Sequence, residues 1–204
     1  LSAPLLGNET RSGHAETWLW LGRPREDHPP TGDPRQALAS LLSEDEMDRA
    51  DRLRFAADRW SYCAAHAGLR VLLAQALEAH PRDVTFAVSP GGKPALDPAR
   101  HGSAACAELH FNISHTRGMV AVALSRRPVG IDVEPVRPLP DMRNLVATLM
   151  APEALAAFDA AEDDAVRIEL FFRYWTLGEA FIKATGLGLD QGLDSFAFTP
   201  AGEP

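Results

Sequence analysis

Hydrophobic and polar positions along the chain follow two periods, and each period predicts a different kind of element. Short alternating or continuous apolar runs predict strands. These runs are Thr17–Leu21, Val84–Val88, Leu109–Ile113 and Met119–Leu124. Residues 97–108 are expected to be an irregular loop, whereas Ser114–Gly118 predicts a turn after which the Met119–Leu124 strand returns antiparallel.

Longer stretches have the 3.6-residue spacing of helices. They are Met47–His80, Leu145–Ala157 and Asp164–Gly186. Ser43 stands three residues before Glu46, which is the spacing of a capping box, so the first helical stretch is expected to open there. A break between Ala56 and Arg59 divides that stretch into two helices.

Two ten-residue segments of the chain are similar to each other. Residues 85–94 and 195–204 share five identities, and each segment follows a long helix. A match this short also arises by chance, because strand–turn sequences use few residue types. The repeat predicts an α+β fold with a pseudo-two-fold arrangement of two similar α+β halves, each a small antiparallel-rich sheet packed on a long helix.

The expected boundaries are 17–128 for the N-terminal α+β half and 129–204 for the C-terminal α+β half. The first copy of the repeat continues into a hairpin, whereas the second copy ends at Pro204. We therefore expect the last strands of the C-terminal half to be missing from this chain. The chain also lacks an initiator Met, which indicates that it begins inside a longer protein.

Composition narrows the class of protein. The chain has 204 residues, 46% hydrophobic and 24% charged, and a net charge of -8. This is ordinary globular composition, and the acidic balance argues against nucleic-acid or anionic-membrane partners. Cys63 and Cys106 form neither a disulfide framework nor a metal-type spacing, so a reducing cytoplasm is expected. Neither a transmembrane run nor a signal peptide is evident.

An acidic motif, Gly130-Ile131-Asp132-Val133-Glu134, follows the last predicted strand. In an extended chain, successive side chains alternate, so Asp132 and Glu134 point the same way. Two carboxylates on one face suit Mg2+, which prefers oxygen ligands. The alternative is a strand that leaves the core with a solvated acidic edge.

Arginines gather on the first helical stretch, and they have two interpretations. Arg49, Arg52, Arg54 and Arg59 lie within eleven residues of an acidic protein. They are either a solvated helix face or a patch that binds an anion.

Three segments carry a resemblance to a known family: Phe111–Thr116 (FNISHT), Gly130–Glu134 (GIDVE) and Trp175–Ala184 (WTLGEAFIKA). Their order and spacing resemble the 4'-phosphopantetheinyl transferase superfamily, in its larger, surfactin-synthetase-activating type. The resemblance implies an enzyme of post-translational modification in secondary metabolism. It would transfer 4'-phosphopantetheine from coenzyme A to a serine of an acyl or peptidyl carrier protein and release 3',5'-ADP.

The resemblance also implies roles for particular residues. Asp132, Glu134 and Glu179 would be the catalytic carboxylates and the Mg2+ ligands. Glu179 and Lys183 are four residues apart on one helix face, which in isolation predicts only an ion pair worth about 0.2–0.5 kcal/mol. The implied coenzyme A contacts are Arg49, Arg59, Gly92, Lys93, Pro94, Ser114, His115 and Lys183. Of these, Arg59 is equally well explained as a surface charge.

One departure from the family pattern bears on activity. Gly178 stands where the family has a lysine, before the glutamate of the third motif. One alternative is therefore a coenzyme A-binding homologue with impaired transfer. A further alternative is an unrelated Mg-dependent nucleotide hydrolase built on Asp132, Glu134 and Glu179.

The expected partners are carrier-protein domains of fatty-acid, polyketide or nonribosomal-peptide synthases, with neither nucleic acid nor membrane involved. The docking surface is expected around Met142–Met150. The protein itself is expected to be a cytoplasmic monomer.

Overall fold

The computed structural model describes residues 10–11, 17–23, 34–88, 92–188 and 191–198. The strands are β1 (Thr10–Arg11), β2 (Thr17–Gly22), β3 (Phe86–Val88), β4 (Pro94–Leu96), β5 (His110–Thr116) and β6 (Met119–Ser125). The helices are α1 (Pro34–Leu38), α2 (Glu44–Asp51), α3 (Ala56–Leu77), α4 (Pro98–His101), α5 (Ser103–Glu108), α6 (Met142–Leu149), α7 (Pro152–Ala160) and α8 (Asp164–Thr185), with a 3-10 turn, η1 (Pro81–Asp83).

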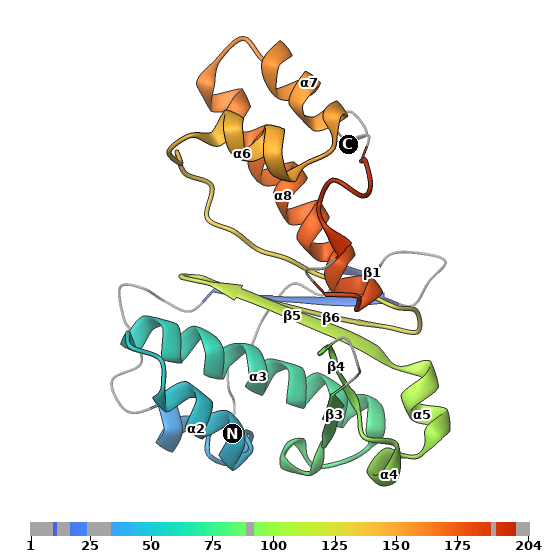
Figure 1. The fold of residues 1–204 in the computed structure, drawn as a ribbon. Helices are drawn as coiled ribbons and strands as arrows, with labels where there is room; N and C mark the ends of the chain where they lie inside the picture. The colour runs from blue at the N-terminus through green and yellow to red at the C-terminus, as the bar shows by residue number, and fades with distance from the viewer. Residues whose placement is uncertain (1–9, 12–16, 24–33, 89–91, 189–190, 199–204) are drawn as a thin grey trace.

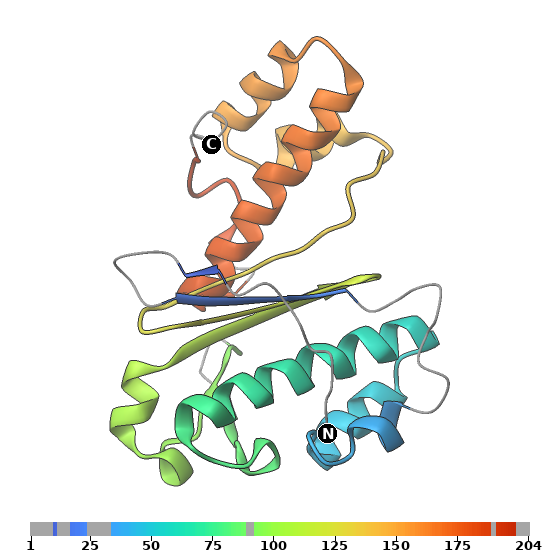
Figure 2. The ribbon, with the colours of Figure 1, turned by 180° about the vertical axis from the view of Figure 1, so that it is seen from behind.

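A four-stranded antiparallel sheet separates the molecule into two parts. Its strand order is β1-β2-β6-β5, and β3 and β4 form a separate hairpin. Helices α2 and α3 lie on one side of the sheet together with the hairpin, whereas α6, α7 and α8 stand on the other side (Figures 1 and 2). The C-terminal end of α8 comes down onto the sheet, so this end of the helix is the meeting point of the two parts.

The alternation of side chains along β6 explains why both faces of the sheet are covered. Val120, Val122 and Leu124 are buried in a core cluster with residues of α3. Ala121 and Ala123 are also buried, but period-2 geometry directs them to the opposite face. Large side chains thus fill the α3 side, and small ones allow close approach on the α8 side.

The second core lies within the helical part. Buried residues of α6, α7 and α8 form one cluster: Val146, Met150, Ala154, Phe158, Phe171 and Phe172. Trp175 stacks on Phe171, with ring centroids 5.8 Å apart, and packs against this cluster. Helix α8 therefore has its own packing support along most of its length. None of the helices in the described ranges combines the length and hydropathy that a membrane crossing requires.

The capping box at the start of α2 is confirmed, because the Ser43 hydroxyl accepts from the Glu46 amide and the Glu46 carboxylate accepts from the Ser43 amide. The β6 strand and its antiparallel pairing with β5 are also confirmed. The break between α2 and α3 lies at residues 52–55, earlier than predicted.

Three other predictions need correction. Residues 97–108 are not an irregular loop: they form α4, where Asp97 caps the amide of Ala99 and Pro98 takes the first turn, and α5. Strand β5 continues through Ser114 to Thr116, because its pairing with β6 holds until the tight turn at Gly118. The stretch 145–157 is split into α6 and α7, with Pro152 opening the second helix.

The α+β class is confirmed, but the pseudo-two-fold arrangement is not. Within 129–198, the described residues form α6, α7 and α8 and contribute to neither sheet. The described part of the second repeat copy, 195–198, is not assigned to a strand, and its last six residues lie outside the described ranges.

Candidate active site

The acidic segment 130–134 lies against the last turns of α8. A Cβ placed on Gly130 would overlap the carbonyl oxygen of Ala180 and come within 2.6 Å of the amide nitrogen of Ala184. Only glycine allows the backbone to approach a helix this closely. The alanines at 180 and 184, one turn apart, leave room for it on the helix side.

Two polar side chains of β5 hold this segment to the sheet. Asn112 Oδ1 accepts a hydrogen bond of 2.9 Å from the Ile131 amide. Ser114 Oγ accepts from the Val133 amide at 3.3 Å and donates to Asp132 Oδ1 at 3.0 Å. Because Asn112 and Ser114 are two residues apart in a strand, they share one face, and that face is the one toward α8.

Asp132 and Lys183 form the central ion pair of the site. Lys183 Nζ lies 2.5 Å from Asp132 Oδ1, and only 5% of the Asp132 side chain is exposed. The second carboxylate oxygen, Oδ2, is buried and has no hydrogen-bond partner within the described residues. A buried carboxylate oxygen without a partner is unfavourable by itself, so this atom is suited to bind an added cation or donor.

The three predicted carboxylates influence one another electrostatically. The pKa of Glu134 is raised first by desolvation and then by the negative charges of Asp132 and Glu179, while Lys183 opposes the rise. In the described part of the chain, however, no group of three His, Cys, Asp or Glu side chains is arranged so that it could hold a metal ion. The carboxylate oxygens that Mg2+ prefers are therefore present and repel one another, but they are not arranged as a complete set of metal ligands.

Ser114 and His115 point to opposite faces of the sheet. Ser114 belongs to the α8 side, whereas the His115 ring meets the Tyr62 ring of α3 edge-on, with centroids 6.0 Å apart. Burial lowers the pKa of His115, and the neighbouring His66 and Lys183 lower it further, against a smaller opposing effect of Asp58. The pair does not lie in a turn as expected, but on the two faces of one strand near its end.

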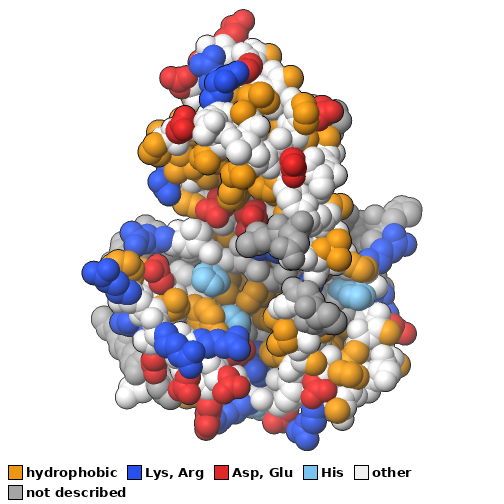
Figure 3. Space-filling view, in the orientation of Figure 1, with side chains coloured by type: hydrophobic (Ala, Val, Ile, Leu, Met, Phe, Trp, Pro, Cys, Tyr) orange, Lys and Arg blue, Asp and Glu red, His pale blue; other side chains and the backbone are white. Residues whose placement is uncertain are grey.

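A pocket of about 340 Å³ lies on the α3 side, between α2, α3, the hairpin and β5. Its lining includes Arg49, His66, Arg70 and Arg82 together with the acidic Asp45 and Glu46, and Phe86, Val88 and Phe111 provide apolar walls. Figure 3 shows that this side of the molecule is hollowed beneath the helical part, with histidine side chains inside and Lys and Arg side chains around it. The pocket offers both positive charge and apolar surface, as a nucleotide requires.

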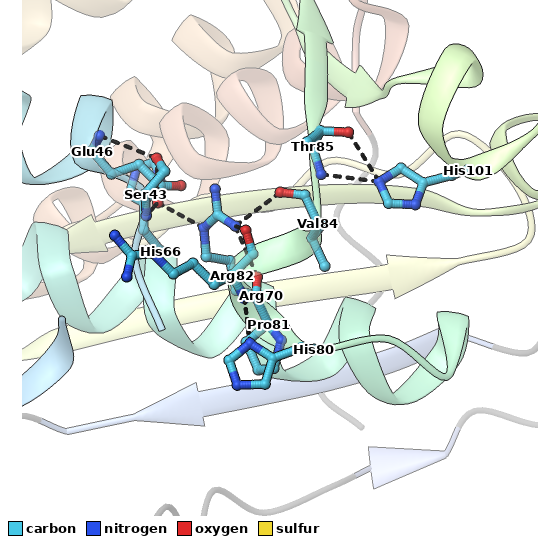
Figure 4. A network of polar contacts seen from close by, with 10 residues as sticks. All are labelled: Ser43, Glu46, His66, Arg70, His80, Pro81, Arg82, Val84, Thr85 and His101. Carbon is cyan, nitrogen blue, oxygen red and sulfur yellow. Dashed lines mark hydrogen bonds and ion pairs between the residues drawn. The ribbon is translucent and has the colours of Figure 1, made fainter. Parts of the chain in front are cut away.

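A buried polar network forms the inner wall of this pocket (Figure 4). Arg70 Nε donates to Glu46 Oε2 at 2.6 Å, and Arg70 Nη1 donates to the carbonyls of Pro81 and Val84 at 2.8 Å each. His66 Nδ1 lies 3.2 Å from Glu46 Oε1. Burial opposes ionisation of Glu46, but hydrogen bonds from His66, Arg70 and Ser43 hold its pKa down at about 2.

The remaining predicted coenzyme A contacts do not all lie at the pocket. Pro94 lines the pocket with Arg49. Gly92 is exposed, with a φ of 81° that favours glycine. Arg59 Nη1 instead donates to the Leu53 carbonyl at 2.8 Å, across the connection between α2 and α3. Lys93 also points at backbone, because its ammonium donates to the carbonyls of Val129 and Ala184.

Gly178 does not face the acidic segment. It is buried, and a Cβ at this position would lie 2.5 Å from Leu193 Cδ2 and 3.7 Å from the Phe196 ring. Residues 193–198 thus pack against α8 over this glycine, where Phe181, Phe196 and Phe198 form an aromatic cluster. A lysine at position 178 would therefore meet Leu193 and Phe196 first.

Sequence reasoning did not single out Asn112, His66, Arg70 or Glu46 as parts of the site. Asn112 lies within the quoted FNISHT motif, and Glu46 was assigned only to the capping box. His66 and Arg70 follow Tyr62 at intervals of one helical turn, a signal that places them on one helix face without indicating what they face.

Comparisons with known proteins agree on one family. A family model described as "4'-phosphopantetheinyl transferase superfamily" matches residues 128–204. A second, described as "4'-phosphopantetheinyl transferase, N-terminal", matches residues 27–127. The two matches together extend over both parts of the molecule and meet at the connection that carries the acidic segment.

Individual relatives have similar names. The chain is 36% identical over 155 residues to the 4'-phosphopantetheinyl transferase HetI of Nostoc sp., covering 76% of this chain and 63% of the relative. It is 32% identical to a putative 4'-phosphopantetheinyl transferase of Synechocystis sp., covering 76% and 61%. With the 4'-phosphopantetheinyl transferase Sfp of Bacillus subtilis it shares 25% identity, covering 84% and 72%. The chain thus spans less than two thirds of the length of the first two relatives.

Proposed function

The chain belongs to the 4'-phosphopantetheinyl transferase superfamily, and we propose on that premise that it transfers 4'-phosphopantetheine from coenzyme A to a serine of a carrier protein. The observation that carries the proposal is the cluster of Ser114, Asp132 and Lys183 at one end of β5. It combines a fixed cation, a hydroxyl and a buried carboxylate beside two further carboxylates.

Coenzyme A would lie around the open edge of the sheet. Within the described residues, β5 is the outer strand on its side of the sheet, next to β6. The basic and apolar pocket on the α3 side would take the phosphorylated adenosine, with Arg49 and His66 near the 3'-phosphate. The pyrophosphate would then cross the edge near His115 to reach Ser114 and Lys183 on the α8 side.

Each of these residues has a defined part in binding. The Lys183 ammonium can exchange its short contact with Asp132 for a phosphate oxygen, since both are anionic acceptors. Ser114 can donate its hydroxyl to the same phosphate. His115, whose pKa is lowered by burial, is neutral near pH 7 and can donate one N–H to an arriving phosphate.

The donor atoms fit Mg2+ in kind. Asp132 supplies a buried oxygen that has no partner among the described residues, and Glu134 and Glu179 supply charges whose mutual repulsion a divalent cation would relieve. We propose these three residues as its ligands. When bound, Mg2+ would neutralise charge on the pyrophosphate as 3',5'-ADP leaves.

Transfer requires a base for the incoming hydroxyl. The carrier serine oxygen would form a bond to the phosphorus that bears pantetheine, and the bond from that phosphorus to the leaving 3',5'-ADP oxygen would break. We assign the serine proton to Glu179, which lies one helical turn from Lys183 on α8.

The partner proposal narrows the surface expected around Met142–Met150 to the outer face of α6. Met142 and Leu145 of α6 pack against the helical core rather than facing outward. Leu149, 38% exposed, is an apolar residue that α6 presents to solvent. We propose that α6 docks the carrier protein through this outer face, and that the enzyme acts in the cytoplasm as a monomer whose second half has a pseudo-two-fold relation to the first.

The decisive experiment is transfer of a fluorescent pantetheine from its coenzyme A conjugate to a purified peptidyl carrier protein, with Mg2+ or with EDTA. We expect labelling with Mg2+, loss of labelling with EDTA, and a loss of at least about a hundredfold in Asp132→Ala, as for groups that stabilise transition-state charge. Saturable coenzyme A binding without labelling would instead support a binding protein. Release of phosphopantetheine into water without a carrier would support a hydrolase.

The binding-protein alternative rests on Gly178. If the absence of a lysine at position 178 abolishes transfer, Gly178→Lys should restore labelling. Gly178→Ala is the matched control. Because a Cβ at this position overlaps Leu193, both variants should lose about 1–3 kcal/mol of stability. We expect neither to gain activity, and a gain confined to Gly178→Lys, in its own background or with Leu193→Ala, would favour the alternative.

A further inference from the structure

Lys93 joins three segments that are far apart in the sequence. It lies directly before β4, and its Nζ donates to the Val129 carbonyl at 2.9 Å and to the Ala184 carbonyl at 3.3 Å. Val129 belongs to the connection after β6, and Ala184 belongs to the last turn of α8. One ammonium therefore bridges the hairpin, the connection and the helix; we call this arrangement the Lys93 clamp.

The two carbonyls of the clamp belong to the backbone that carries the active-site ion pair. Val129 precedes Gly130, whose backbone lies on Ala180 and Ala184, and Asp132 follows two residues later. Ala184 immediately follows Lys183. The clamp thus holds the acidic segment and α8 together beside the point where Asp132 meets Lys183.

The clamp also suits the end of a helix electrostatically. Carbonyls in the last turn lack intrahelical partners and carry the negative end of the helix dipole, so a cation is favourable there. The Lys93 stem lies over Gly186, which caps α8 with a φ of 71°. Burial lowers the pKa of Lys93, and the two carbonyls replace part of the water that its ammonium has lost.

The position of Lys93 differs from that of the residues assigned to coenzyme A. Arg49 and His66 line the pocket on the α3 side. Lys93 lines a second hollow, which adjoins the pocket at Pro94 and Phe111, together with His110, Pro128 and Thr185. Its ammonium is directed to backbone oxygens, which are the acceptors expected for a residue that holds segments in place.

We propose that Lys93 is a positioning residue for phosphopantetheinyl transfer, which fixes the acidic segment against α8 and so sets the spacing of Asp132 and Lys183. The inference rests on the proposed function and assigns Lys93 a different part from the direct coenzyme A contact that the resemblance implied. Lys93 binds the carbonyls of Val129 and Ala184. It affects the reaction through Asp132 and Lys183, which lie close to those carbonyls in the sequence.

The test compares Lys93→Met, which keeps an apolar stem without a donor, with Lys93→Arg, which keeps the charge and donors. The first readout is hydrogen exchange of the Ile131 and Val133 amides, which are hydrogen-bonded to Asn112 and Ser114. We expect Lys93→Met to speed their exchange roughly tenfold or more, because a charge-assisted hydrogen bond is lost from each neighbouring segment. Lys93→Arg should restore most of the protection.

The second readout separates positioning from ligand contact. By calorimetry, Lys93→Met should bind coenzyme A within about twofold of the parent, while kcat for carrier labelling falls roughly tenfold or more, as expected when reacting groups are misplaced. Arg127→Met is the matched control, since it removes an exposed charge from the same connection. It should leave all three measurements unchanged.

The outcomes are distinct. Coenzyme A binding weakened more than tenfold in Lys93→Met, with exchange at Ile131 and Val133 unchanged, would overturn the proposal and support a direct phosphate contact. Absence of labelling in the parent would reject the proposed function, but the exchange measurement would still decide whether the clamp holds the acidic segment.

Discussion

At the scale of single residues, the site depends on Gly130 having no side chain. Gly130 lets the acidic segment lie on α8 with its backbone against Ala180 and Ala184. The Asp132–Lys183 ion pair follows from this contact, because Asp132 comes two residues later on an extended chain. A larger residue at 130 would lift the segment from the helix and separate the charges.

We therefore predict that Gly130→Ala lowers the free energy of unfolding by about 2–4 kcal/mol, at or above the usual range for an inserted methyl, because the overlap is with helix backbone. Urea unfolding at pH 7 measures the change. Gly92→Ala is the control: no atom of the described residues lies within 4 Å of its added Cβ, so it should lose only the roughly 1 kcal/mol due to its positive φ. Equal losses in the two variants would contradict the proposed packing of Gly130.

The raised pKa of Glu134 predicts a pH dependence of stability. Burial and the charges of Asp132 and Glu179 disfavour its ionised form, so its contribution to stability is fully present below pH 4.5 and is lost as the pH rises through the folded-state pKa. Glu134→Gln should therefore be more stable than the parent at pH 7 without Mg2+, and the difference should shrink at pH 4. Denaturant unfolding at both pH values tests this, and a loss of stability at pH 7 would contradict it.

At the scale of elements, a buried ion pair joins α2, α3 and η1. Glu46 is 6% exposed and Arg70 is 3% exposed, and Arg70 also donates to two carbonyls that follow α3. The pair connects the helices that line the proposed nucleotide pocket. Its geometry satisfies most of its donors, which is the condition under which a buried pair holds a structure together.

The low pKa of Glu46 gives a quantitative prediction. A fall from 4.5 to about 2 corresponds to about 3 kcal/mol of folding free energy, which is present above pH 4.5 and is lost as the pH falls toward 2. Glu46→Gln should thus lose about 3 kcal/mol at pH 7 and have a flatter stability curve between pH 5 and pH 2. The control Glu44→Gln, at an exposed ion pair of the same helix, should change stability by less than about 1 kcal/mol.

The elements that the sequence predicted well are those with strong local signals. The capping box at Ser43, the long period of α8 and the apolar run of β6 each specify an element without reference to distant residues. The prediction of a loop at residues 97–108 was wrong, because the two short helices there depend on a single Asp97 cap and on packing rather than on periodicity. The predicted symmetry is not confirmed within the described residues, because a ten-residue similarity does not determine strand pairing.

The residue types of the candidate site could be predicted from the sequence, but the directions in which their side chains point could not. The resemblance of their motifs to one family implied that Asp132 and Lys183 share a site. That Ser114 and His115 face opposite sides of the sheet depends on how far β5 extends. Lys93 donates to the carbonyls of Val129 and Ala184, which are 36 and 91 residues away in the sequence. No local sequence pattern predicts contacts over such separations.

At the scale of the whole molecule, the helical part stands over the sheet and carries the proposed carrier-protein surface (Figure 1). The protein has a net charge of -8, so we expect docking to the proposed carrier protein to depend on local apolar or basic patches rather than on net charge. Leu149 on α6 is exposed, while Met142 and Leu145 support the core beneath it.

We predict that Leu149→Glu raises the KM for the carrier protein roughly tenfold, as loss of an interface contact worth more than about 1 kcal/mol would. The KM for coenzyme A should not change. Val166→Glu adds the same charge to an exposed apolar position at the start of α8 and should leave both constants unaltered. An unaltered carrier KM in Leu149→Glu would remove this face of α6 from the proposal.

The long reach of the Lys93 clamp has a consequence for how the protein is made. A contact across 91 residues closes a large loop, and its entropic cost can be met only after both ends have been synthesised. The sheet and α3 can fold as soon as β6 leaves the ribosome, since domains fold from the N-terminus onward. The acidic segment gains its position only when the end of α8 arrives, so the proposed active site is completed after the sheet has folded.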